Sequence, residues 1–298
     1  MAQFGKVLTA MVTPFREDGT LDLDAAASLA CWLSENGSDG VVVAVTTGEA
    51  PTLTHDEQIE LIGAVVSAVD IPVVAGAGSN DTAAAVELTE RASEAGADGI
   101  LSVAPYYNRP SQAGLVKHFT TVAAATDLPV LIYDIPVRTG RKVDTASLLE
   151  VAHGVANIVG IKDAAGDPAE TASLIAHAPD GFGVYSGDDS LTLPLLAVGA
   201  VGVIGVATHW AGTEHRDMIT AFEKGDVDSA RQINASLMPS FDYETGLAAP
   251  NPIPAKAMMR LIGHPVGRCR PPLDVEPDDL MESAAEVLAG TRLGAAHG

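Results

Sequence analysis

Short apolar runs alternate along the chain with longer stretches in which apolar residues recur at helical spacing. Most of the short runs are rich in valine and isoleucine and lack the polar alternation of a half-exposed strand. There are eight of them: Val7–Val12, Gly40–Val45, Ile71–Ala77, Gly99–Ala104, Pro129–Ile135, Ile158–Lys162, Phe182–Ser186 and Val201–Val206. Strands that are buried on both faces of a parallel sheet have this composition. The pattern therefore predicts eight parallel strands.

The stretches between these runs have the periodicity of amphipathic helices. The clearest are Asp24–Glu35, His55–Val69, Thr82–Ala95 and Gln112–Ala125. Several follow residues whose side chains cap helices, namely Thr54, Asn80 or Asp81, and Ser111. Eight strand–helix units in one α/β chain favour a closed (β/α)8 TIM barrel over an open doubly wound sheet. The G-x-G-x-x-G motif of a dinucleotide-binding sheet is absent after the first run.

The chain continues beyond the eighth run for longer than one helix requires. Helical patterns occupy Thr213–Lys224, Val227–Leu237, Ala255–Ile262 and Asp278–Leu288, with proline-rich joints at Ala249–Pro254 and Pro271-Pro272. We predict a barrel formed by residues 1–226 and a C-terminal helical extension formed by residues 227–298, rather than a second independent domain.

Charge and cysteine content limit the possible partners. The net charge of −22 repels nucleic acids and anionic membranes, so we expect neither as a partner. It also requires local cations to hold any anionic substrate. Cys31 and Cys269 are far apart, which fits a reducing cytosol. Because no apolar run reaches the roughly 20 residues of a membrane span, and no signal sequence opens the chain, we expect a cytoplasmic location.

In a barrel of this type, the reactive side chains lie at the carboxyl ends of the strands. Lys162 ends the sixth run, so its amine is expected at the mouth of the barrel. A desolvated lysine has a lowered pKa and keeps a fraction of free amine that can attack a ketone. The alternative is a structural lysine that pairs with Asp163.

Two further groups belong to neighbouring strand ends. Tyr133 lies near the end of the fifth run, where a phenol can exchange protons with a reacting group, although a core tyrosine is the simpler interpretation. Thr46 and Thr47, before Gly48 and Glu49, close the second run. Their hydroxyls and the exposed turn amides suit a carboxylate, and a helix-capping turn is the alternative.

Two loops carry groups that suit either binding or the surface. Tyr107 belongs to the proline-bounded loop Pro105–Pro110, whose paired aromatics are more often an interface contact. Arg138 follows the fifth run and could pair with a carboxylate or stay solvated. The histidines show no H-E-x-x-H spacing, and the phosphate loop and the G-x-S-x-G elbow are absent, so the sequence indicates no metal ion and no cofactor.

Taken together, these residues resemble the dihydrodipicolinate synthase and N-acetylneuraminate lyase family of class I aldolases along nearly the whole chain. The matching stretches are Thr46–Glu49, Pro105–Pro110, Tyr133–Gly140, Gly160–Asp163, Tyr185–Asp188 and Gly202–Ile204. Several motifs in the right order, on strands of the right number, are far more specific than any one of them alone.

The resemblance implies a set of catalytic roles. Lys162 would form a Schiff base with pyruvate, and Tyr133 would donate and accept protons at that imine. Thr46 and Tyr107 would continue a proton relay, with Tyr107 reaching in from a neighbouring subunit. The family also implies a homotetramer built as a dimer of dimers. No cofactor is implied, because the lysine provides the electron sink.

The resemblance also implies how the substrates are held. Thr47 and the backbone of Ile204 would bind the pyruvate carboxylate, Gly187 would contact substrate, and Arg138 would bind the carboxylate of the second substrate. An arginine in this setting is similar to that of synthases acting on aspartate semialdehyde, which yields 4-hydroxy-tetrahydrodipicolinate on the route to diaminopimelate and lysine. The alternatives are an aldolase or dehydratase of the same family acting on another keto acid, or a catalytically idle sensor barrel.

Some positions depart from the family pattern. Val45 stands where the family usually has glycine, and Glu49 is followed by Ala50 rather than serine. At the lysine-feedback site of some members, His55 and Asn80 fit, but Ala50 and Ala84 replace polar residues. We therefore expect weak or absent inhibition by lysine.

Overall fold

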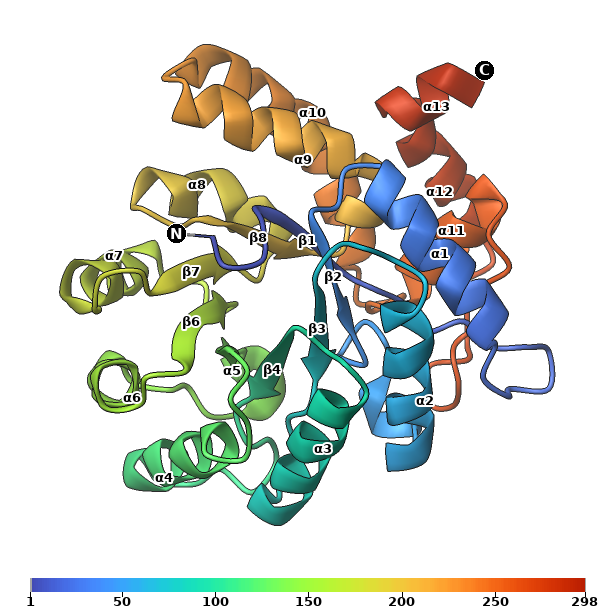
Figure 1. Cartoon of the computed structure of the whole chain (residues 1–298). Helices are drawn as coiled ribbons and strands as arrows, with labels where there is room; N and C mark the ends of the chain where they lie inside the picture. Colours follow the sequence, from blue (N-terminus) through green and yellow to red (C-terminus); the bar gives the residue numbers. More distant parts are fainter. Residues whose placement is uncertain (1, 298) are drawn as a thin grey trace.

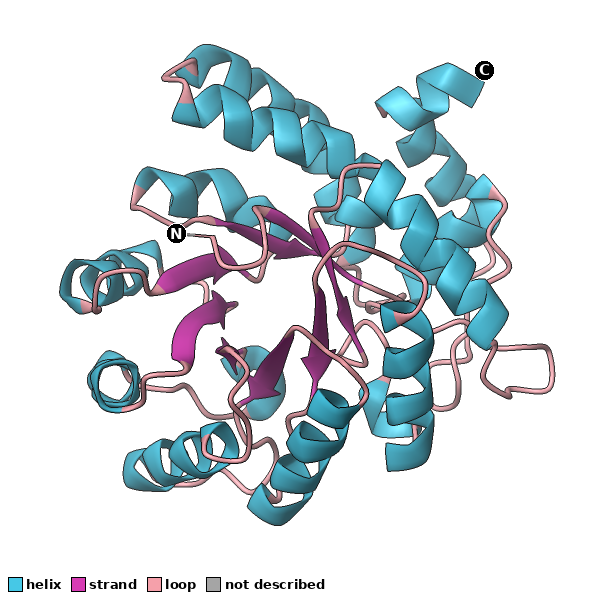
Figure 2. Cartoon of the chain, viewed as in Figure 1, coloured by secondary structure: helices cyan, strands magenta, loops and turns pink. Residues whose placement is uncertain are grey.

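The computed structural model describes residues 2–297 and contains a closed parallel barrel. Its strands are adjacent in chain order, and the last pairs with the first. The strands are β1 Val7–Ala10, β2 Gly40–Val43, β3 Val73–Gly76, β4 Gly99–Val103, β5 Val130–Asp134, β6 Ile158–Asp163, β7 Gly183–Ser186 and β8 Gly202–Gly205. Every predicted run coincides with one of these strands, β6 extending one residue further to Asp163, so the (β/α)8 prediction is confirmed. Figure 2 shows the strands at the centre, with helices around them.

Helices surround the barrel in the intervals between strands. They are α1 Leu23–Glu35, α2 His55–Val66, α3 Thr82–Glu94, α4 Gln112–Ala123, α5 Pro136–Thr139, α6 Thr145–Gly154, α7 Pro168–His177, α8 Thr192–Ala197 and α9 Thr208–Glu223, with 3-10 turns η1 Ala50–Thr52 and η2 Asp189–Leu191. The expected caps are present: Thr54 forms a capping box with Glu57, while Asp81 and Ser111 accept from backbone amides of α3 and α4. These side chains satisfy amides that have no partner within the helix.

The C-terminal segment forms four more helices, α10 Val227–Glu244, α11 Ile253–Ile262, α12 Leu280–Ala289 and α13 Arg292–His297. α10 runs past the predicted end at Leu237 because its buried side continues through Phe241 and Glu244. In Figure 1 these helices lie to one side of the barrel. There α10 packs on α9, α12 packs on α10 and α11, and the ring of His264 contacts that of Trp32 on α1.

The barrel interior is filled with side chains and is not a pore. Its apolar cluster includes Leu101, Tyr133, Tyr185 and Ile204. The Tyr185 hydroxyl donates to the Gly5 carbonyl at 3.0 Å, which anchors this ring near the start of the chain. In such a barrel the reactive groups lie at the carboxyl ends of the strands. Across residues 2–297, no helix has the length and apolar character needed to cross a membrane.

Candidate active site

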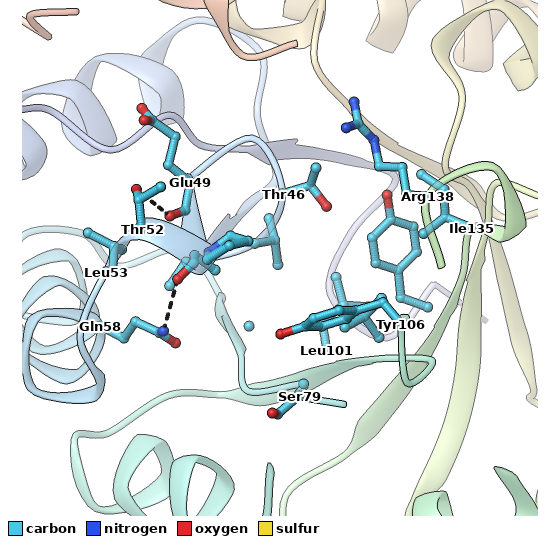
Figure 3. Close-up of a pocket in the computed structure, with 18 of the residues that line it drawn as sticks. Thr46, Glu49, Thr52, Leu53, Gln58, Ser79, Leu101, Tyr106, Ile135 and Arg138 are labelled. Atoms are coloured by element: carbon cyan, nitrogen blue, oxygen red, sulfur yellow. Dashed lines mark hydrogen bonds between the residues drawn. The ribbon is translucent and has the colours of Figure 1, made fainter. Parts of the chain in front are cut away.

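A cavity of about 520 Å³ opens among the loops that follow the strands β2 to β5. Residues of the C-terminal segment, including Asn251 and Leu273, complete its wall. Figure 3 shows Thr46 and Arg138 toward one side of this cavity and Gln58 toward the other. Among the residues with functional groups that line it are Thr46, Glu49, Tyr106, Tyr133 and Arg138. Polar groups thus converge on a space large enough for a small organic acid.

Lys162 and Tyr133 are neighbours at the bottom of this region. They are register partners on β6 and β5, so strand pairing fixes their relative position. The Lys162 Nζ lies 4.6 Å from the centroid of the Tyr133 ring, and both side chains are buried. Tyr133 lines the cavity, and Lys162 adjoins it through this contact. The amine therefore stands at the carboxyl end of its strand, as the apolar run predicts.

Burial moves the pKa values of these two groups in opposite directions. Burial lowers the pKa of Lys162 to about 8; Asp189 and Glu244 oppose this shift, and Arg138 adds to it. Burial raises the pKa of Tyr133 to about 12, against the effect of a hydrogen bond with Thr46. At neutral pH, a fraction of Lys162 is therefore the free amine, while the phenol keeps its proton. A nucleophile and a proton donor thus coexist within one site.

Gly187 and Ile204 are the other two residues expected at the substrate site. A Cβ on Gly187 would lie 3.0 Å from the Lys162 Cγ, so the absence of a side chain at residue 187 leaves room for the lysine stem. Ile204 lies on β8, fully buried, in the same interior cluster as Tyr133. Gly187 therefore adjoins the stem of Lys162 and Ile204 lies in the barrel interior, although neither lines the cavity itself.

The loop after β2 carries the two threonines and has an unusual backbone. Thr46 lines the cavity, and Thr47 is buried. Ala44 and Glu49, at the two ends of this loop, have positive φ values of 56° and 55°. Such values are uncommon in residues with side chains and persist only where the surroundings impose them. The loop is thus held in a shape that its own sequence does not favour.

Arg138 and Tyr107 differ in how they relate to the cavity. Arg138, on the short helix α5, has an exposed side chain and lines the cavity. Tyr107 is 90% exposed and does not line it, whereas its neighbour Tyr106 does. Within a single chain, therefore, the structure gathers Thr46, Tyr133 and Arg138 but leaves Tyr107 at the surface.

The structure adds residues that the sequence patterns did not single out. Asn251 lines the cavity, and its Nδ2 donates to the Thr47 Oγ1 at 3.0 Å. Glu49 forms an ion pair with Lys256 of α11, a residue of the C-terminal segment. The proline-rich joint Ala249–Pro254 is the only sequence signal near these residues. It predicts a fixed turn but does not indicate which residues the turn contacts.

Val45, the departure beside the threonines, also lines the cavity and belongs to the interior apolar cluster. Its Cγ1 would lie 2.6 Å from a Cβ on Gly76 of β3, so the valine occupies space that a glycine there leaves open. The wider side chain is thus accommodated locally by the neighbouring strand.

A parallel barrel with a desolvated lysine beside a buried phenol has the groups that a Schiff-base lyase of the class I aldolase type uses. The chain belongs to the dihydrodipicolinate synthetase family, whose profile matches residues 3–289. The resemblance seen in the sequence motifs is therefore confirmed.

Particular relatives match over nearly the full length. The chain is 48% identical to a 4-hydroxy-tetrahydrodipicolinate synthase of Moorella thermoacetica, covering 98% of this chain and 99% of that one. It is 51% identical to one of Acidothermus cellulolyticus, covering 98% and 91%. A solved dihydrodipicolinate synthase from Cyanidioschyzon merolae, with lysine bound, superposes with a TM-score of 0.94 at 43% identity, covering 97% and 99%.

Proposed function

We propose that this chain condenses pyruvate with L-aspartate 4-semialdehyde to form 4-hydroxy-tetrahydrodipicolinate, with Lys162 as the Schiff-base lysine. The observation that carries the proposal is the buried Lys162 amine, 4.6 Å from the Tyr133 ring centre, with a pKa near 8. The names and near-complete coverage of relatives at 48% and 51% identity favour this reaction over other members of the family.

The chemistry begins with attack of the neutral Lys162 amine on the ketone carbon of pyruvate. The resulting carbinolamine loses its hydroxyl as water, and the Tyr133 phenol supplies the proton that this departure requires. We assign Thr46, whose hydroxyl acts to lower the pKa of Tyr133, to the proton relay that continues from the phenol. The Tyr133 phenolate then accepts a methyl proton of the protonated imine, which gives the enamine and restores the phenol. We assign Thr47 and the Ile204 backbone to the pyruvate carboxylate, with Gly187 beside them.

The enamine carbon attacks the aldehyde of the second substrate and forms the new carbon–carbon bond. The amine of that substrate then displaces Lys162 by transimination, which closes the ring and frees the lysine. Arg138 is assigned to the carboxylate of the second substrate, because an arginine pairs with carboxylates in a two-pronged geometry. In a chain with a net charge of −22, an anion needs such a local cation.

The assembly and location are part of the proposal. We assign a homotetramer arranged as a dimer of dimers, in which Tyr107 completes the site of a neighbour. Tyr107 and Val137 are 90% and 86% exposed, and large exposed apolar side chains support a contact surface there. We also assign a catalytic barrel to residues 1–226, a C-terminal extension to residues 227–298, and a cytoplasmic location.

Reductive trapping tests the reaction class. The protein is incubated with pyruvate and sodium borohydride, and its intact mass is compared with that of Lys162→Ala. A reduced pyruvyl adduct on the wild type alone supports the proposal, whereas the absence of an adduct on both leaves an idle barrel. Steady-state assays of aspartate semialdehyde against sugar-acid substrates then separate the synthase from another aldolase or dehydratase.

A further inference from the structure

Lys256 is a buried cation away from Lys162. It lies on α11 with its side chain fully covered, and its Nζ is 2.6 Å from the Glu49 Oε1, which is equally buried. The same Nζ donates to the Arg268 carbonyl at 3.0 Å and lies 4.0 Å from the centroid of the Phe15 ring. Burying two charges costs so much desolvation energy that such a pair is weak evidence of a stabilising role. The contacts of Lys256 instead indicate that it holds the position of Glu49.

The partner of Lys256 is the residue that ends the threonine loop. Besides the ion pair, the Glu49 Oε2 accepts from the Arg270 backbone amide at 2.8 Å. In Figure 3 the Glu49 carboxylate points away from Thr46. Because the φ of Glu49 is 55°, its backbone conformation needs support from outside the loop. The two contacts fix both carboxylate oxygens and so supply that support.

The rest of the loop is fixed by contacts of the same kind. The Thr13 hydroxyl donates to the Gly48 carbonyl at 2.6 Å, and the Asn251 amide donates to the Thr47 Oγ1 at 3.0 Å. Since Thr47 accepts from Asn251, its own hydroxyl hydrogen can be donated elsewhere. Of the residues making these contacts, Asn251, Lys256 and Arg270 all belong to α11 and its flanking segments.

We infer that Lys256 is a positioning residue: by holding Glu49, it fixes the loop that places Thr47 at the pyruvate carboxylate and Thr46 in the proton relay. This inference rests on the proposed function, because it assigns the loop to pyruvate. It makes the C-terminal segment part of the substrate site without contact to the reacting atoms. Displacement of a binding group by about 1 Å can cost about 100-fold in rate, so the expected effect is large.

The test is the pyruvate dependence of borohydride trapping in Lys256→Met, which keeps much of the side-chain length and removes the charge. We expect the pyruvate concentration for half-maximal trapping to rise about 10-fold or more. Arg260→Met is the matched control. Arg260 lies one turn further along α11 and pairs with Glu276 at 2.7 Å rather than with a residue of the loop. Both variants should lower the melting temperature, but only Lys256→Met should change the pyruvate dependence.

The double variant Glu49→Gln/Lys256→Met covers the case in which a lone buried charge prevents folding. Removing both charges of a buried pair is far less costly than removing one. We expect the double variant to recover melting temperature but to keep a raised half-maximal pyruvate concentration. The inference is overturned if folded Lys256→Met, or the folded double variant, has the half-maximal pyruvate concentration of the wild type. It is also overturned if Arg260→Met raises this concentration as much as Lys256→Met does. Failure of the wild type to trap pyruvate overturns the proposed function instead.

Discussion

The Lys162 Nζ lies 4.6 Å from the centre of the Tyr133 ring, and strand pairing between β6 and β5 sets this separation. The same burial lowers the pKa of the amine to about 8 and raises that of the phenol to about 12. One packing environment therefore prepares a nucleophile and preserves a proton donor.

The rate of pyruvate trapping should depend on pH through Lys162. Only the neutral amine attacks, so below its pKa each added pH unit should raise the initial rate about 10-fold. Above a pH of about 8 the rate should level off. Timed borohydride quenching followed by intact mass measures this profile. A rate that continues to rise toward the pKa of an ordinary lysine contradicts the assignment.

Tyr133→Phe should lower kcat by about 10²- to 10⁴-fold, which is the usual contribution of a positioned proton-transfer group. The ring remains, so stability should fall by only about 1 kcal/mol for the lost hydrogen bond. Tyr185→Phe is a matched control, because Tyr185 is also buried but its hydroxyl bonds to the Gly5 carbonyl. The steady-state rates of the two variants should diverge, while their melting temperatures should fall by similar amounts. Equal losses of activity would count against a role for the Tyr133 hydroxyl.

Arg138→Met should raise KM for aspartate semialdehyde about 10- to 100-fold, as expected for the loss of a hydrogen bond to a charged group. Pyruvate should still be trapped. Burial is the main cause of the lowered pKa of Lys162, and Arg138 adds to it. Removing Arg138 should therefore raise that pKa and move the pH profile of trapping to higher pH. Arg138→Lys should keep the profile but not the full affinity, since lysine lacks the two-pronged geometry. An unchanged KM for aspartate semialdehyde in Arg138→Met contradicts the assignment of Arg138 to the carboxylate of that substrate.

Mixing two inactive variants tests whether Tyr107 acts in a neighbouring subunit. A Lys162→Ala subunit can still offer its Tyr107 to the intact Lys162 of a Tyr107→Phe partner. After subunit exchange, activity should recover to about a quarter of the wild-type value, because half of the pairs are mixed and each mixed pair has one complete site. Sedimentation measures the assembly in parallel. Exchange without recovery, or an active monomer, contradicts the assignment of Tyr107.

Lysine should inhibit weakly or not at all. Ala50 and His55 line the cavity, but Ala50 offers no polar side chain, and His55 lies 3.6 Å from Glu87. Installing a hydroxyl and a carboxylate in Ala50→Ser/Ala84→Glu should strengthen inhibition, because these groups can pair with an amino acid's ammonium group. Steady-state assays across lysine concentrations measure both proteins. Half-inhibition of the wild type at submillimolar lysine contradicts this prediction.

The barrel and its lysine were predictable because their signals are local. An apolar run that ends in Lys162 indicates a buried strand and a group at its carboxyl end within a few residues. The contacts of Thr47 with Asn251 and of Glu49 with Lys256 have no such signal. They join residues about 200 positions apart, and no periodicity relates them. The full length of α10 was missed because Pro239 lies inside the helix.

The order in which the chain is synthesised gives these long-range contacts a consequence. β8 ends at Gly205, so all eight strands leave the ribosome before Asn251 and Arg270, which are 204 and 221 residues beyond their loop partners. Nascent chains fold from the N-terminal end as they emerge. A nascent barrel therefore carries Lys162 before the threonine loop has its anchors. On the role inferred for Lys256, pyruvate binding is a property of the finished chain, because an interrupted translation product has Lys162 but lacks the anchors of the loop.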